Sequence, residues 1–103
     1  MTCRIAYICG VQGLSLVPLL RGITKPEDLM VFASQSAFKE WEGDTQNIEP
    51  IECAEMLRTA LATFHPDIIF VMTYLSKLDV SLSKSSKYGM INIHPSLLPE
   101  YRG

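Results

Sequence analysis

The chain has 103 residues, of which 48% are hydrophobic, and its formal net charge is −2 with the basic residues scattered along the sequence. This length supports one hydrophobic core, so residues 1–103 are expected to form a single domain. The lack of a basic cluster argues against direct binding to nucleic acid or to an anionic membrane surface, and no apolar run is long enough to span a membrane.

The chain begins with the pattern of a strand, a turn and a helix. Residues 4–9 (Arg-Ile-Ala-Tyr-Ile-Cys) are rich in strand formers, and a loop from Gly10 to Gly13 separates them from a helix over residues 14–21. The loop lacks the third glycine of a dinucleotide fingerprint and the Lys-Ser/Thr of a P-loop. A plain strand-to-helix turn is therefore about twice as favoured as a phosphate cradle.

The next segment predicts a second buried strand and then a long loop. Pro18 is tolerated near the first turn of the preceding helix, and Gly22 is expected to end that helix. The second strand covers residues 29–33. Residues 34–47 are polar, contain Trp41 and show no clear period, so they are expected to form a loop with one helical turn.

The middle of the chain predicts a short edge strand and an amphipathic helix. The strand covers residues 48–51 and is placed at an edge because Pro50 cannot donate a ladder hydrogen bond. Apolar residues then recur at helical spacing over residues 52–64. The dipeptide His65-Pro66 is expected to end the helix, since a residue before proline is disfavoured in the helical conformation.

The last part of the chain predicts two further strands. Residues 67–72 (Asp-Ile-Ile-Phe-Val-Met) form an apolar run typical of a strand covered on both faces, which is expected to be central. Residues 76–87 are polar with apolar residues at every second position, which predicts a loop and one or two helical turns. Gly89 then leads into a strand over residues 90–93.

This order of elements predicts an α/β fold, a doubly wound and mostly parallel sheet of about five strands with right-handed crossovers. Ligands of such sheets bind outside the carboxyl ends of the strands. Three segments are expected at that edge, namely residues 10–13, 73–78 and 92–99. Their convergence predicts the position of a ligand site.

The three cysteines, Cys3, Cys9 and Cys53, stand among apolar residues without metal-ligand spacing. They are expected to be reduced thiols in the core, and neither a disulfide nor a metal site is expected. Reduced thiols and the lack of a targeting segment predict a cytoplasmic location.

Asn92 and His94 are the leading candidates for chemistry. They are two residues apart on the last strand, so their side chains leave the same face about 6–7 Å apart and could hold one polar ligand atom. From the residues alone, His94 at a strand end is about twice as often structural as catalytic, and Asn92 could instead cap a turn.

The string from Asn92 to Pro99 (Asn-Ile-His-Pro-Ser-Leu-Leu-Pro), followed by Tyr101-Arg102-Gly103, closely resembles the signature of the formyltetrahydrofolate-dependent formyltransferases. The strand ending near Tyr74, the Leu-Ser-Lys-Leu loop and the Tyr-Gly before the motif strand are also similar to that family. The resemblance covers the whole chain in arrangement and its last third in detail. It implies the amino-terminal half of a Rossmann-like formyltransferase domain.

The resemblance implies transfer of a formyl group from 10-formyltetrahydrofolate to a primary amine. Asn92 and His94 match the catalytic pair that holds the formyl oxygen, where preorganised donors contribute about 3–4 kcal/mol each. The Tyr-Arg-Gly ending is more similar to the branch that acts on methionyl-tRNA or amino sugars than to the purine branch. The residues that match folate-binding positions are Ser96, Leu97, Leu98 and Pro99 along the folate, and Leu75, Leu78 and Met90 around the pterin pocket.

The family's third catalytic residue is an aspartate downstream of the motif, and this chain has no match for it. Asp67 and Asp79 precede the motif and are not assigned to that role. Three hypotheses follow: a chain that carries part of a formyltransferase site, an inactive folate-binding module, and an association module whose open last strand pairs with another copy or a complementary chain.

Overall fold

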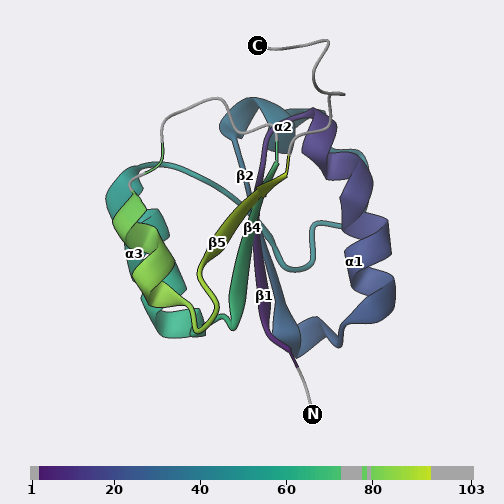
Figure 1. The fold of residues 1–103 in the computed structure, drawn as a ribbon. Helices are drawn as coiled ribbons and strands as arrows, with labels where there is room; N and C mark the ends of the chain where they lie inside the picture. The colour runs from purple at the N-terminus through teal and green to yellow at the C-terminus, as the bar shows by residue number, and fades with distance from the viewer. Residues whose placement is uncertain (1–2, 73–77, 79, 94–103) are drawn as a thin grey trace, which may run out of the picture.

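The computed structural model describes residues 3–72, 78 and 80–93, which form an α/β fold around one sheet (Figure 1). All strand pairs are parallel, and the strand order is β3-β2-β1-β4-β5. The strands are β1 (Ile5–Cys9), β2 (Leu29–Ala33), β3 (Ile48–Pro50), β4 (Ile68–Met72) and β5 (Met90–Ile93). The helices are α1 (Val17–Ile23), α2 (Gln35–Glu40) and α3 (Ala54–Phe64), with 3-10 helices η1 (Gln12–Leu16), η2 (Pro26–Asp28) and η3 (Val80–Ser85). The predicted fold class is confirmed.

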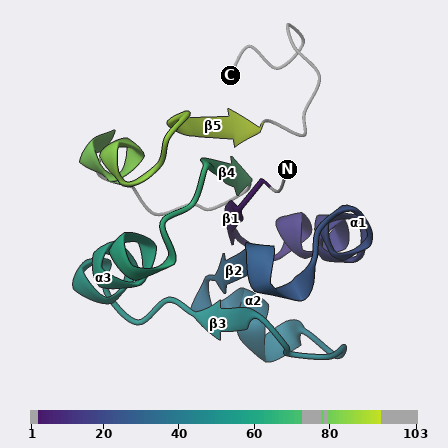
Figure 2. The same cartoon turned by 90° about the horizontal axis from the view of Figure 1, so that it is seen from below.

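Helices cover both faces of the sheet. α1 and α2 lie on one face, whereas α3 and η3 lie on the other (Figure 2). From β1 the chain moves outward to β2 and β3 through α1 and α2, and then returns through α3 to β4 and through η3 to β5. The strand order therefore reverses between β1 and β4, the place at which doubly wound sheets bind ligands beyond the carboxyl ends of their strands.

β1 is the middle strand, and all its residues are buried. It pairs with β2 on one side and β4 on the other, so that Cys9 lies level with both Ala33 and Met72. The expectation that residues 67–72 form the central strand is only partly correct, because β4 is an interior strand next to the edge strand β5. The sequences of β1 and β4 are similarly apolar, so they identify both as interior strands but do not show which of the two lies in the middle of the sheet.

Each face of the sheet has its own hydrophobic core. Tyr7 and Cys9 belong to the core beneath α1 and α2, whereas Ala6 and Ile8 belong to the core beneath α3. This alternation is the expected consequence of successive strand side chains pointing to opposite faces. We call these the first core and the second core.

The end of α1 differs from the prediction. Pro18 lies in the first turn, as expected, but the helix continues through Gly22 to Ile23. It ends at Thr24, whose backbone is extended and whose hydroxyl donates a hydrogen bond to the Leu20 carbonyl at 2.8 Å. The prediction that Gly22 ends this helix is wrong, because the backbone of Thr24 and its side-chain hydrogen bond provide the stop.

The polar stretch over residues 34–47 contains a six-residue helix, α2, and so has more helix than one turn within a loop. Ser34 caps α2, and its Oγ accepts a hydrogen bond from the Ala37 amide at 3.2 Å. A serine at this position satisfies one of the amides that a helix start leaves unpaired. The serine and the short apolar pair Ala37 and Phe38 are the local signals for this helix.

The amphipathic helix α3 starts two residues later than the predicted range and ends where it was expected. His65 has φ 56° and ψ 62°, a left-handed conformation that ends the helix. β3 pairs only with β2 among the described residues, so the edge placement of Pro50 is confirmed.

The cysteines are free, but only Cys9 is buried, and the expectation of core positions for Cys3 and Cys53 is wrong. Cys53 is the residue before the first turn of α3 and lies outside its buried stripe. Burial raises the pKa of the Cys9 thiol to about 12.

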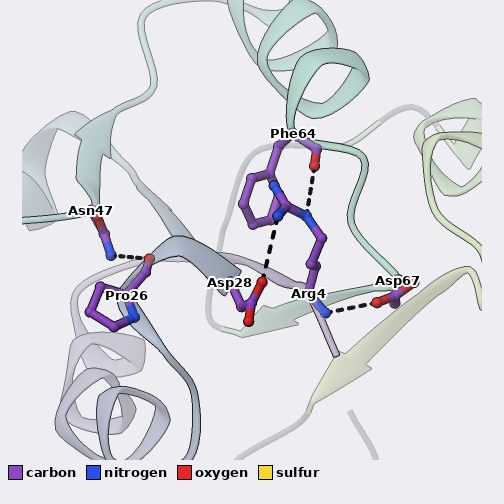
Figure 3. Close-up of polar contacts among 6 residues, drawn as sticks. All are labelled: Arg4, Pro26, Asp28, Asn47, Phe64 and Asp67. Atoms are coloured by element: carbon purple, nitrogen blue, oxygen red, sulfur yellow. Dashed lines mark hydrogen bonds and ion pairs between the residues drawn. The ribbon is translucent and has the colours of Figure 1, made fainter. Parts of the chain in front are cut away.

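Arg4 connects four segments at the amino-terminal edge of the sheet (Figure 3). Its Nε donates to the Phe64 carbonyl at 3.0 Å, and its guanidinium lies 4.3 Å from the centre of the Phe64 ring. The guanidinium also pairs with Asp28 at 3.5 Å, while the Arg4 amide donates to Asp67 at 2.8 Å. These contacts connect the starts of β1 and β4, the end of α3 and the end of η2.

Replacement of Arg4 tests the contribution of these contacts. Arg4→Ala should lower the free energy of unfolding by about 2–3 kcal/mol, because it removes a cation–π contact and two side-chain hydrogen bonds. Arg58→Ala, at an exposed ion pair with Glu55, should change it by less than about 0.5 kcal/mol. Urea denaturation of both variants measures the difference, and equal effects would contradict this account.

The burial of Cys9 predicts unequal thiol reactivity. At pH 8, a thiol reagent should modify Cys3 and Cys53 in the folded chain, whereas Cys9 should react only after unfolding. Because the folded pKa of Cys9 is raised from 9.0 to about 12, this thiol should also reduce stability as the pH rises above about 9. Peptide mapping of the modified chain and a pH series of unfolding midpoints check the two expectations.

Candidate functional site

Asn92 lies on the edge strand β5 near its carboxyl end, and its side chain is exposed. Its register partner on β4 is Val71, so it shares the α3 face of the sheet with Met90, whose partner is Ile69. A polar amide at the carboxyl end of a parallel strand is where this class of sheet places ligand contacts. The described structure therefore leaves Asn92 available to a ligand.

Most of the other predicted site residues lie outside the described residues. These are His94, Ser96, Leu97, Leu98, Pro99 and Leu75. Leu78 and Met90 are described, and both are partly buried against the second core. The structure therefore brings Asn92, Met90 and Leu78 to one side of the sheet, where the two apolar side chains could also border a flat ring.

Asp67 lies at the opposite edge of the sheet from Asn92. It precedes β4, and its carboxylate accepts a hydrogen bond from the Arg4 amide. Asp79 lies outside the described residues.

Three strand ends are joined by backbone hydrogen bonds at the carboxyl edge. The Gly10 amide donates to the Met72 carbonyl at 3.1 Å, which connects the end of β1 to the end of β4. The Ser34 amide donates to the Cys9 carbonyl at 3.0 Å, which connects β2 to β1. These bonds fix the positions from which the following loops leave the sheet.

Tyr7 is a residue at this edge that the sequence analysis did not single out. Its ring is fully buried, and its hydroxyl donates to the Gly13 carbonyl at 2.7 Å and lies 3.4 Å from Met72 Sδ. Burial, and secondarily the neighbouring Cys9, raises the pKa of this hydroxyl, which therefore stays protonated. The only sequence signal was a phenol in an otherwise apolar strand.

Gly13 has a packing role in the turn after β1. A Cβ on Gly13 would lie 2.7 Å from Cys9 Cβ and 2.9 Å from both the Met72 carbonyl oxygen and the Tyr7 hydroxyl. The turn also contains a hydrogen bond from the Gly13 amide to the Gly10 carbonyl at 3.1 Å, and it leads directly into η1. The loop from Gly10 to Gly13 is thus a tight turn that leads from β1 into η1.

An apolar groove of about 360 Å³ lies on the other face of the sheet. It is lined by Cys3, Ile5, Tyr7, Leu16, Leu20, Ile23, Ile68, Phe70 and Ile93. The described residues that line it include no charged side chain and do not include Asn92. The groove is thus separate from the face that carries the candidate amide.

Among the described residues, no three His, Cys, Asp or Glu side chains are grouped closely enough to hold a metal ion. None of the helices in that part of the chain is long and apolar enough to cross a membrane.

Comparison with known proteins identifies formyltransferases among the relatives of this chain. Residues 25–103 match the family model described as formyl transferase. A methionyl-tRNA formyltransferase of Orientia tsutsugamushi is 42% identical over 59 residues, which are 52% of this chain and 19% of that protein. A GDP-perosamine N-formyltransferase of Brucella melitensis is 50% identical over 42 residues, which are 41% of this chain and 16% of that protein.

A solved structure, a 4-N formyltransferase from Francisella tularensis, has the same fold. It aligns with a TM-score of 0.61 and 22% identity over 93% of this chain and 40% of that chain. The matched stretch is less than a fifth of the length of the two relatives named above.

A pair of glycine substitutions tests the close packing at the carboxyl edge. Gly13→Ala should destabilise the fold by about 1–3 kcal/mol, because the added methyl would overlap Cys9 and Met72. Gly22→Ala should leave stability unchanged or raise it by up to about 1 kcal/mol, since open space surrounds that helical position. Thermal unfolding compares the two, and a harmless Gly13→Ala would refute the packing role.

Proposed function

Because the chain belongs to the formyl transferase family, we propose that it carries part of a site that transfers a formyl group from 10-formyltetrahydrofolate to a primary amine. The proposed acceptor is methionyl-tRNA or an amino sugar. The names of the two relatives, a methionyl-tRNA formyltransferase and a GDP-perosamine N-formyltransferase, support this choice. A cytoplasmic location is part of the proposal.

The observation that carries the proposal is the position of Asn92. Its exposed amide lies near the carboxyl end of β5, beside the partly buried Met90 face, and it opens the motif shared with the family. An amide N–H held on a strand can donate to an oxygen on which negative charge develops. Asn92 is therefore proposed to bind the formyl oxygen together with His94.

The proposed reaction forms one bond and breaks another. The acceptor nitrogen attacks the formyl carbon, and the oxygen of the resulting tetrahedral intermediate is stabilised by Asn92 and His94. Collapse of the intermediate breaks the bond between that carbon and the folate nitrogen. The proton lost by the amine reaches the folate nitrogen, with His94 as the proposed carrier because its pKa is ordinarily near neutrality.

The folate would be held by groups on both sides of the proposed amide. Met90 and Leu78 have partly buried apolar side chains on the α3 face, which suit a flat ring. Ser96, Leu97, Leu98, Pro99 and Leu75 are proposed as further folate contacts on the strength of the sequence motif.

Substitution of Asn92 in the complete protein tests the proposal. Asn92→Ala should lower kcat for formyl transfer by about 10²–10³, since it removes one donor to the developing oxyanion. Ile91→Ala is the matched control, because Ile91 is also exposed on β5 but belongs to the opposite face. Its kcat should stay within about twofold of the wild-type value, and an unchanged rate for Asn92→Ala would refute the site.

A folate-binding measurement beside the activity assay tests the alternative of an inactive module. Binding of tetrahydrofolate without measurable transfer by the unmodified complete protein would support a folate-binding module. Among the described residues β5 pairs with β4 alone, and the side chain of Ile91 on this strand is 46% exposed, which supports association with another chain as the remaining alternative. That outcome would require a stable assembly that is insensitive to folate.

A further inference from the structure

A buried phenol connects the turn after β1 to the end of β4. We propose that the Tyr7 hydroxyl is a positioning group for the formyl-transfer site, acting on Asn92 through Gly13 and the end of β4. This inference rests on the proposed function. The three polar contacts that carry it are Tyr7 to Gly13 at 2.7 Å, Tyr7 to Met72 at 3.4 Å, and Gly10 to Met72 at 3.1 Å.

Core packing does not require the hydroxyl of Tyr7. The residue is fully buried in the first core, and Phe32 on β2 fills the second core with a ring that carries no polar atom. A buried hydroxyl costs free energy unless it forms a hydrogen bond, so a phenylalanine would fill the same space without the need for a hydrogen-bond partner. The hydroxyl of Tyr7 instead donates its hydrogen bond to the carbonyl of Gly13, in the turn at the carboxyl edge of the sheet.

The close approach of Gly13 makes this contact specific. Any side chain at residue 13 would meet the Tyr7 oxygen and the Met72 carbonyl, each 2.9 Å from the position of a Cβ. The turn is therefore close enough to touch both β1 and β4 at once. Tyr7 and Gly13 together determine how far the turn lies from the end of β4.

The position of Asn92 depends on β4. Among the described residues, β5 pairs with β4 alone, and Ile93 lies level with Met72. Asn92 is the residue immediately before Ile93. A displacement of Met72 would therefore move the end of β5 and the amide that the site uses.

Loss of the Tyr7 hydroxyl should affect the chemical step more than donor binding. Asn92 is proposed to act on the intermediate, so a small misplacement should lower kcat and leave the donor KM nearly unchanged. For Tyr7→Phe in the complete protein, we expect kcat to fall about tenfold and KM to change by less than about twofold, with rates normalised to the folded fraction. Tyr88→Phe, which removes an exposed hydroxyl, is the control and should retain the wild-type kcat.

A double-mutant cycle distinguishes positioning from general destabilisation. If Tyr7 acts through Asn92, adding Tyr7→Phe to Asn92→Ala should cause no further loss of kcat. Multiplicative losses in the double variant, or a wild-type kcat for Tyr7→Phe, would overturn the inference while leaving the proposed function intact. A wild-type kcat for Asn92→Ala would overturn the proposed function and the inference that rests on it.

Discussion

The register between β1 and its two neighbours is the constraint on which the candidate site depends. Cys9 lies level with Ala33 on β2 and with Met72 on β4, so the three strands end at one edge. Backbone hydrogen bonds continue beyond these pairs, from Ser34 to Cys9 and from Gly10 to Met72. The loops that follow the strands therefore leave from one place, and the reversal of strand order between β1 and β4 opens the sheet there.

The burial of β1 explains why this register is fixed. Its side chains alternate between the first core and the second core, and all are buried. A slip of one residue would exchange the two faces and place Tyr7, which fits beside Gly13, on the α3 face. The close contact between residue 13 and Tyr7 would then be lost, so the turn and the register support each other.

The sequence was sufficient for elements with a sharp local boundary. β2 and β5 have the predicted bounds, because polar Ser34 follows β2 and Gly89, with φ 89°, precedes β5. The sequence was insufficient where the end of an element depends on the backbone conformation of a single residue or on a single side-chain hydrogen bond. The end of α1 is determined by Thr24 and its hydrogen bond to Leu20. The preference for glycine just after helix ends had predicted a helix two residues shorter, ending before Gly22.

The site was predictable only where a motif or a strand end marked it. Asn92 was identified by its place in the motif, and its exposure follows from its position on an edge strand. Tyr7 was not identified, because a tyrosine in an apolar strand predicts core packing and its contact with Gly13 exists only after the turn has folded back. Leu78 and Met90 remain compatible with both packing and ligand contact, because partial burial against the second core suits either role.

The two faces of β5 differ in what they can do chemically. Ile93 borders the apolar groove on the α1 face, which is lined by apolar side chains in the part of the chain that the structure describes. Asn92 lies on the other face, beside the partly buried Met90. Recognition of a formyl oxygen requires a directed donor, and in the proposed transfer reaction Asn92 supplies that donor on the α3 face. β4 is the one described strand that pairs with β5, and its last residue, Met72, is itself tied to the side of β1 by the hydrogen bond from the Gly10 amide.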